Sequence, residues 1–123
     1  MYEVYKESDF SGAHNLRGYK GKCEAVHGHN WRVQVYVRAA ELDEQGMVVD
    51  FTILGARLED VLAELDHKDI NAVPPFDTVN PSSENIARYI FDKMAAALDD
   101  ARRQVSRVLV WETDRSCAVY QRD

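Results

Sequence analysis

Two histidines separated by one glycine, with a cysteine four residues earlier, form the stretch of the chain with the clearest chemical meaning, "CEAVHGHNW" from Cys23 to Trp31. From His27 to Arg38 apolar and polar residues alternate, which predicts a half-buried β-strand. Side chains two apart on a strand share a face, with Cα atoms roughly 6.5–7 Å apart. Imidazoles at that spacing can bind one ion at Zn–N distances of about 2.0–2.1 Å.

A third histidine, His14, lies at the end of the first predicted strand. If the first two strands pair, His14, His27 and His29 converge at one end of the sheet. Three neutral imidazoles are the ligands of a catalytic zinc site that keeps its fourth position open, and they favour zinc over magnesium or calcium. Alternatively, each histidine is an ordinary residue satisfied by hydrogen bonds. The H-x-H pair together with His14 favours a Zn²⁺ site.

Cys23 has two possible roles beside such an ion. As a fourth ligand it would close the site and make the protein a zinc-stapled binding module, and spacing alone leaves this open. However, a chain with two amphipathic helices has little need of a metal to fold. The cations Arg17, Lys20 and Lys22 in the same loop favour a thiolate. We therefore expect Cys23 to act as nucleophile or base, and Cys117 to be a small buried residue.

The composition limits the classes of function. The length of 123 residues predicts one domain, residues 1–123, and 46% hydrophobic with 29% charged residues is ordinary for a soluble protein. A net charge of -6 argues against nucleic acid as the main partner. No apolar run suits a transmembrane helix, the first residues do not resemble a signal peptide, and the two cysteines form no disulfide framework. We therefore expect a cytoplasmic protein without a membrane partner.

Changes in periodicity predict the order of the elements. Residues 2–10 form a first strand, and residues 27–40 form a second after a polar loop. A turn at Gly46 leads into an extended run, "MVVDF", which we expect to form a hairpin with the second strand. From Thr52 the leucines follow helical spacing, with Asp50 or Thr52 as N-cap and an end near residues 66–69.

A second helix is predicted over residues 80–98, with Asn80 as cap and Pro81 in the first turn. Residues 104–114 and 116–122 then pair around a turn at Asp114–Arg115. The order ββααββ predicts an α+β fold, a four-stranded antiparallel sheet with both helices on one face. Such a sheet leaves two edges and a poorly covered face, so we expect it to oligomerise into a larger barrel.

Motifs along nearly the whole chain resemble one known family. In order they are "FSGAH" (10–14), "CEAVHGHNW" (23–31), "GMVVDF" (46–51), "LDHKDIN" (65–71), "NPSSENIA" (80–87) and "WET" (111–113). They resemble the 6-pyruvoyltetrahydropterin synthase family, and the C-x-x-x-H-G-H spacing is similar to its bacterial branch, the 6-carboxy-5,6,7,8-tetrahydropterin synthases of queuosine biosynthesis. The resemblance implies the tunnelling fold, in which trimers form a barrel and stack into a homohexamer with active sites between subunits.

The resemblance also implies roles for individual residues. It makes the three histidines the zinc ligands, Cys23 the catalytic thiol, and Asp66 with His67 a proton-handling pair. Taken alone, His67 could equally be a capping residue at the end of the first helix. Glu112 would hold the pterin ring, because a carboxylate accepts two parallel N–H bonds.

Ser82 and Ser83 would contact the substrate from the start of the second helix, with helix capping as the alternative. The implied substrate is 7,8-dihydroneopterin triphosphate, and the implied products are 6-carboxytetrahydropterin, acetaldehyde and triphosphate. Arg17, Lys20 and Lys22 are candidates to attract the triphosphate, although an ordinary solvated loop explains them equally well. A 6-pyruvoyltetrahydropterin synthase and a non-catalytic zinc module are the alternative functions.

Overall fold

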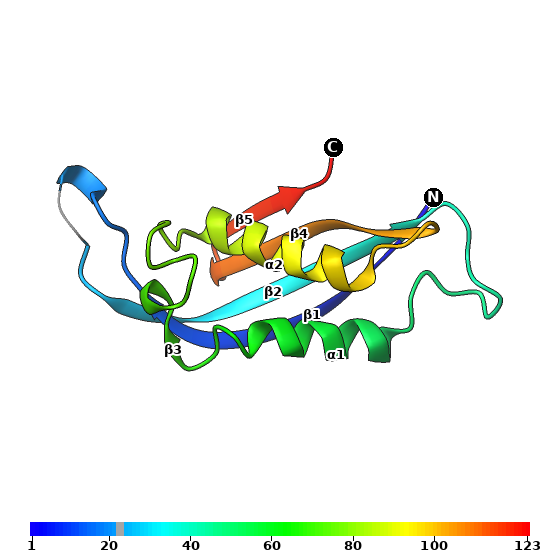
Figure 1. The fold of residues 1–123 in the computed structure, drawn as a ribbon, viewed down its shortest axis with the longest axis horizontal. Helices are drawn as coiled ribbons and strands as arrows, with labels where there is room; N and C mark the ends of the chain where they lie inside the picture. Colours follow the sequence, from blue (N-terminus) through cyan, green and yellow to red (C-terminus); the bar gives the residue numbers. More distant parts are fainter. Residues whose placement is uncertain (22–23) are drawn as a thin grey trace.

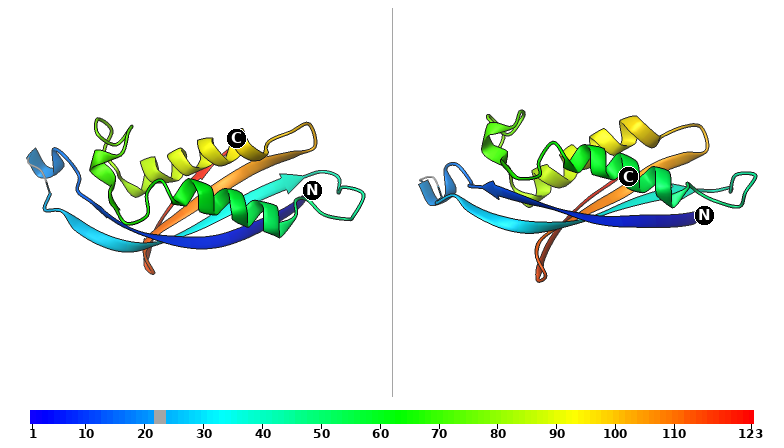
Figure 2. Two further views of the ribbon diagram at one scale, coloured as in Figure 1. Left: turned by 60° about the horizontal axis from the view of Figure 1, so that its bottom comes forward. Right: turned by 90° about the horizontal axis from the view of Figure 1, so that it is seen from below.

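In the computed structural model, which describes residues 1–21 and 24–123, two helices lie across one face of a twisted sheet (Figures 1 and 2). The antiparallel strands are β1 (Tyr2–His14), β2 (His27–Ala39), β4 (Arg103–Thr113) and β5 (Ser116–Gln121). A short strand β3 (Lys68–Asp69) pairs in parallel with β1, so the described residues form a five-stranded mixed sheet in the order β3-β1-β2-β4-β5.

The longest pairing joins β1 to β2 and fixes which side chains face the helices. It continues without a break from Tyr2 opposite Ala39 to His14 opposite His27. Alternate residues of β2 from Trp31 to Ala39 are buried, which confirms the predicted period of two. β1 runs four residues beyond the predicted end, because "SGAH" continues the ladder instead of opening a loop. His14 is thereby the last residue of the strand.

The two helices begin at side-chain caps. α1 (Phe51–Leu62) is capped by Asp50, as predicted, and its buried residues include Leu54 and Leu58. α2 (Ser83–Leu98) buries the predicted stripe of Ile86, Ile90, Met94 and Leu98. The prediction that Asn80 caps this helix is wrong: the Ser82 side chain accepts the Asn85 N–H instead. α1 also ends earlier than predicted, at Leu62, and turns cover residues 63–67.

The hairpin expected between β2 and "MVVDF" is absent from the described residues. Gly46, at φ 83°, closes a turn in which its N–H donates to the Asp43 carbonyl at 3.0 Å. Val48 and Val49 are both buried, although they are consecutive, so this run does not alternate like a strand. The Arg102 guanidinium donates to the Met47 and Val48 carbonyls and takes the place of a strand partner.

The sheet also has one strand more than predicted. His67 has a left-handed backbone, φ 58°, which turns the chain after α1 and lays β3 beside Gly12 and Ala13. Two residues are too few to show periodicity in a sequence. Both helices lie on one face, as predicted, and the opposite face of the sheet is open in the single chain (Figure 2).

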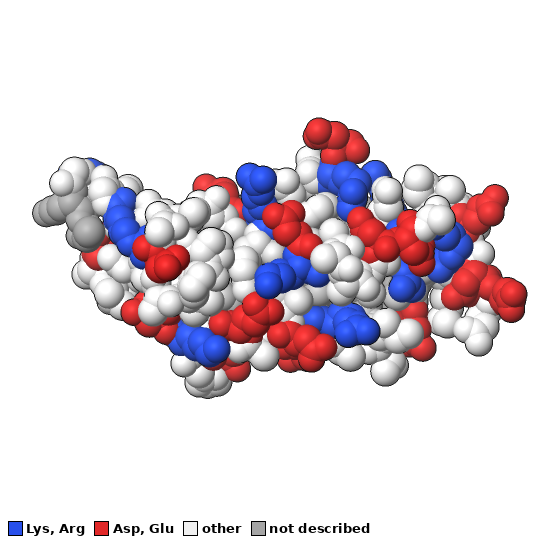
Figure 3. Space-filling model, viewed as in Figure 1, with Lys and Arg blue, Asp and Glu red and all other residues white. Residues whose placement is uncertain are grey.

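The surface is mixed in charge. Acidic and basic side chains intermingle over the face drawn in Figure 3. No helix in the described part of the chain is long and apolar enough to cross a membrane. Two 3₁₀ turns, η1 (Tyr19–Gly21) and η2 (Ile70–Ala72), lie near the end of the sheet where His14 and His27 meet.

Candidate metal centre

Strand register brings the three N-terminal histidines together. His14 on β1 lies opposite His27 on β2, and His29 lies opposite Gly12, one step along the same face. Directly opposed residues on antiparallel strands have Cβ atoms about 4.5–5.5 Å apart. The ring centroid of His14 lies 4.7 Å from the ring centroid of His27 and 5.3 Å from that of His29. The convergence expected from the sequence is therefore present.

Backbone carbonyls fix the outer nitrogen of two of these rings. His14 Nδ1 lies 2.7 Å from the Pro81 carbonyl oxygen, and His27 Nδ1 lies 2.9 Å from that of Ala25. Because a carbonyl oxygen can only accept, each Nδ1 carries a proton, and in the neutral ring this leaves the lone pair on Nε2. A hydrogen bond of this kind sets the tautomer of a metal-binding histidine. Neither carbonyl could be identified from sequence spacing.

Glu112 completes the cluster from the neighbouring strand. It follows Trp111, which pairs with Arg32, so its side chain reaches the same end of β2. Its Oε1 lies 3.1 Å from His14 Nε2 and 3.0 Å from His29 Nε2. One potential ligand atom from each of the four side chains lies within 4.8 Å of the others. The resemblance predicted Glu112 as a substrate-binding residue, but not as a neighbour of the imidazoles.

The residues fit a divalent ion of zinc type. His29 Nε2 is buried and has no properly aligned hydrogen-bond partner among the described residues, despite its 3.0 Å distance to Glu112. Burial lowers the pKa of His29, and the nearby His14 and His27 lower it further, against the opposing effect of Glu112. A neutral imidazole with an unshared nitrogen is the form that binds a metal. Three imidazoles and one carboxylate form a donor set that suits zinc.

An apolar floor supports this cluster. Trp31 is fully buried, its ring packs edge-on against His14 and His29, and it stacks on Phe10. Its indole N–H donates to the Gly12 carbonyl at 3.1 Å, which ties the floor to β1. The rings therefore have little freedom on this side. Trp31 belongs to the same alternating run that predicted the strand, so its inward direction was readable from the sequence.

Asp66 and His67 form a separate pair at the edge of the sheet. The two carboxylate oxygens divide their partners: Oδ1 accepts the Ser11 N–H at 2.9 Å, and Oδ2 lies 2.9 Å from His67 Nδ1. The Ser11 N–H, followed by His67, holds the pKa of Asp66 below its usual value. The Asp66 carboxylate is therefore charged at neutral pH and can orient the exposed His67 ring.

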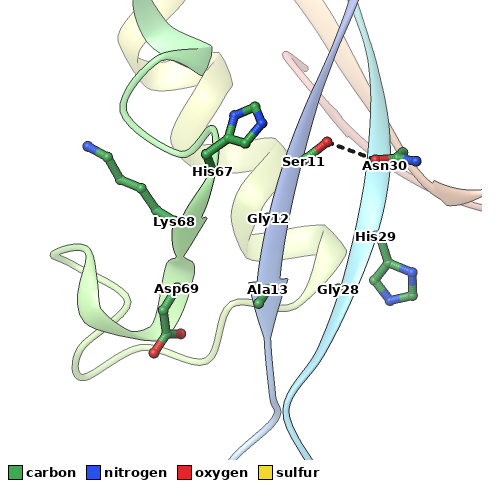
Figure 4. Close-up of a pocket in the computed structure, with 9 residues that line it drawn as sticks. All are labelled: Ser11, Gly12, Ala13, Gly28, His29, Asn30, His67, Lys68 and Asp69. Carbon is green, nitrogen blue, oxygen red and sulfur yellow. Dashed lines mark hydrogen bonds between the residues drawn. The ribbon is translucent and has the colours of Figure 1, made fainter.

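Within one chain this pair does not meet the cluster of imidazoles. Residues of β1, β2 and β3 line a cavity of about 460 Å³, and His67 and His29 both contribute to this lining. Figure 4 shows the two rings apart, on opposite sides of the β1–β2 pair.

Of the three residues expected to contact the substrate, two lie together and one does not. Glu112 and Ser83 line a common cavity of about 290 Å³ between the start of α2 and β5. Ser82 does not line it, because its hydroxyl caps the helix, as the alternative reading predicted.

The cationic loop is only partly accessible. The Arg17 guanidinium donates to the Phe76, Asn71 and Val79 carbonyls at 2.6, 3.2 and 3.4 Å, so it is committed to the protein itself. Lys20 is exposed. Cys23 and Lys22 lie outside the described residues, so their predicted roles remain predictions.

Cys117 differs from its prediction: it is exposed on β5. Partial burial nevertheless raises the pKa of its thiol, which does not favour a reactive thiolate.

The fold and the cluster define a class of protein: an α+β domain whose sheet holds a candidate centre of three imidazoles and one carboxylate. A family model described as 6-pyruvoyl tetrahydropterin synthase matches residues 3–123, and the chain belongs to this family.

Individual relatives agree with this membership. A 6-carboxy-5,6,7,8-tetrahydropterin synthase from Synechocystis is 40% identical over 79% of this chain and 78% of its own length. A 6-pyruvoyl tetrahydrobiopterin synthase from Poecilia reticulata is 35% identical over 96% and 88%. The structure of the Caenorhabditis elegans 6-pyruvoyl tetrahydropterin synthase superimposes with a TM-score of 0.84, at 26% identity over 99% of this chain and 96% of that one.

Proposed function

We propose that this chain is a zinc-dependent carbon–carbon lyase of queuosine biosynthesis. It converts 7,8-dihydroneopterin triphosphate, with uptake of water, to 6-carboxy-5,6,7,8-tetrahydropterin, acetaldehyde and triphosphate. The observation that carries the proposal is the convergence of His14, His27 and His29 beside the Glu112 carboxylate, in a chain of this family. The C-x-x-x-H-G-H spacing and the name of the Synechocystis relative favour the carboxy product.

His14, His27 and His29 hold the zinc ion through their Nε2 atoms. When bound, the ion supplies a Lewis acid that makes the side-chain hydroxyls of the substrate more acidic. The Trp31 floor and the Pro81 and Ala25 carbonyls keep the rings oriented. Glu112 and Ser83 take the edge of the pterin ring in the cavity they share, where the carboxylate accepts the 2-amino and ring N–H groups.

Proton transfer is assigned to Cys23 and to the Asp66–His67 pair. The Cys23 thiolate removes the proton from the first side-chain carbon, and the electron pair left behind reduces the dihydropterin ring internally. No external reductant is needed, and the sequence has no glycine-rich dinucleotide motif. His67, held by Asp66 at 2.9 Å, exchanges protons with the side-chain hydroxyls during triphosphate loss and carbon–carbon cleavage.

The complete site requires more than one copy of the chain in this proposal. His67 and His29 lie on opposite sides of the β1–β2 pair within one chain (Figure 4), whereas the reaction needs His67 and the imidazole cluster at one substrate. β5 forms one edge of the sheet, and β1 is paired on its outer side at Gly12 and Ala13. Edge-to-edge pairing into a barrel, and on to a cytoplasmic homohexamer, lets one copy supply His67 to the metal centre of another.

A product assay tests the proposal. The purified zinc-loaded protein is incubated with 7,8-dihydroneopterin triphosphate, and acetaldehyde, triphosphate and the pterin product are measured. We expect acetaldehyde and 6-carboxytetrahydropterin in equal amounts. Triphosphate release without acetaldehyde would instead identify a 6-pyruvoyltetrahydropterin synthase, the activity named for the Poecilia reticulata relative. Release of neither product refutes both and leaves the non-catalytic zinc module.

A further inference from the structure

After His14, where β1 ends, the amide side chains of two asparagines form hydrogen bonds with the backbone, in place of a neighbouring strand. Asn80 accepts the Arg17 N–H through Oδ1 at 2.9 Å and donates to the Arg17 carbonyl through Nδ2 at 3.0 Å. Asn71 repeats the pattern with the N–H and carbonyl of Asn15, at 2.9 and 3.0 Å. Each amide satisfies one donor and one acceptor of the backbone, as a paired strand would. The segment after β1 is thus fixed to the segment before α2.

Asn80 also has its own backbone fixed, next to a metal-site contact. Its carbonyl accepts from Asn85 Nδ2 at 2.9 Å, which ties it to the first turn of α2. The next residue, Pro81, gives the carbonyl that accepts His14 Nδ1–H at 2.7 Å. The proline ring restricts φ, so the direction of this carbonyl depends on how its neighbours are held. Asn80 holds one side, and the Ser82 cap holds the other.

We propose that Asn80 is a positioning residue of the metal centre. It aims the Pro81 carbonyl at His14 by linking the Arg17 backbone to the start of α2 on the residue directly before Pro81. Loss of the side-chain amide removes the tie to the Arg17 backbone. The Pro81 carbonyl is then held less firmly against His14, whose tautomer and orientation it fixes. Mutation of a residue that hydrogen-bonds to a metal-binding histidine typically lowers metal affinity by about 10–100-fold. The inference rests on the metal site of the proposed function, but on no step of the reaction.

Zinc titration without substrate tests this role. Apo-protein is titrated with Zn²⁺ against a chromophoric chelator, for the parent chain, Asn80→Ala and Asn80→Asp. We expect Asn80→Ala to bind zinc about ten-fold more weakly. Asn80→Asp keeps the acceptor for the Arg17 N–H and should lose less. Co²⁺ in place of zinc should show an altered visible spectrum in Asn80→Ala, because its absorption depends on ligand geometry.

A matched control separates positioning from general stability. Asp99 also clamps backbone and side chain, through the Val105 N–H at 2.7 Å and Arg122, but at the far end of α2. Asp99→Ala should therefore lower stability and leave zinc affinity unchanged. Parent-like zinc affinity in Asn80→Ala overturns the proposal, and where Asn80→Ala does not fold, parent-like affinity in Asn80→Asp does so. An equal loss of affinity in Asp99→Ala also overturns it. A parent chain that binds no zinc overturns the metal site as well, whereas a failed lyase assay leaves this result standing.

Discussion

At the scale of single residues, the candidate metal centre depends on which nitrogen of each ring is left free. His14 and His27 give their Nδ1 protons to backbone carbonyls, and His29 keeps a buried Nε2 without an aligned partner in the described chain. Each of the three rings therefore has a nitrogen available to bind a cation, and no hydrogen bond joins one ring to another in the described chain. Glu112 is the closest anion and offsets part of the charge that a divalent ion would bring.

Replacement of His27 should remove the metal. His27→Ala deletes one of three imidazoles, and we expect the isolated protein to contain less than about a tenth of the zinc of the parent. Loss of a mere hydrogen-bond partner of a ligand already lowers metal affinity by about 10–100-fold. Metal analysis after dialysis against a weak chelator measures the ratio. His67→Ala is the control, because this ring lies outside the cluster and should leave zinc content unchanged. Equal zinc in His27→Ala and the parent would contradict the ligand assignment.

Cys23 should be needed for turnover and not for zinc. We expect Cys23→Ala to retain the zinc stoichiometry of the parent. It should lose acetaldehyde formation, because alanine has no group that can accept a proton as the thiolate does. Alkylation of the zinc-loaded parent gives a second measurement, in a Cys117→Ser background because Cys117 is exposed. Rapid labelling supports a free thiolate. Protection that ends when zinc is stripped would make Cys23 a ligand and refute its catalytic role.

At the scale of elements, the close approach of β1 to the segment after α1 places the Asp66–His67 pair. A Cβ on Gly12 would lie 3.0 Å from Ile70 Cδ1 and 3.3 Å from the Leu65 carbonyl oxygen. This backbone oxygen cannot rotate away as the end of a side chain can. Glycine at position 12 therefore lets the chain pass close enough for Asp66 to accept the Ser11 N–H.

Gly12→Ala should be destabilising, whereas Gly28→Ala should not. Overpacking of this kind costs about 1–3 kcal/mol, and we expect that loss in the free energy of unfolding of Gly12→Ala, measured by urea titration. The pair is well matched, because a Cβ on Gly28 meets nothing nearer than the Gly12 carbonyl oxygen at 3.8 Å, an ordinary contact. Similar stability in the two variants would show that the segment at Leu65 can move away.

At the scale of the whole molecule, the proposed function divides the residues of the active site into two half-sites on the single chain. The imidazole cluster and Glu112 lie on the helix-covered side of β2 and β4, and Asp66 with His67 lies at the edge formed by β3. Neighbouring copies that pair through their sheet edges would bring unlike half-sites together. The open face of the sheet would then line the inside of the barrel, so its charged residues would stay hydrated.

Oligomers that mix two inactive variants should recover part of the activity that each variant lacks alone. His27→Ala and His67→Ala are each expected to be inactive. Random mixing by co-expression should restore roughly a quarter of the sites, because a site between two copies needs one intact half from each. His27→Ala mixed with His14→Ala is the control and should stay inactive, since both ligands belong to one cluster. No recovery in the first mixture would mean that one chain supplies the whole site.

The sequence alone determined what depends on local spacing. Period-two alternation placed β2 and made His27, His29 and Trp31 share a face, and helical spacing identified the buried stripe of α2. These patterns are readable because each residue's direction follows from its own backbone period. The family motifs added the expectation for Glu112 and for the Asp66–His67 pair, although not their positions.

Tertiary structure decided what depends on partners distant in the chain. The Arg102 guanidinium, and not a strand, satisfies the backbone at Met47 and Val48, and Arg17 is committed to three carbonyls instead of facing a phosphate. The left-handed backbone of His67 added β3. Each outcome is a competition for hydrogen bonds between segments more than fifty residues apart, and that competition is settled when the elements pack.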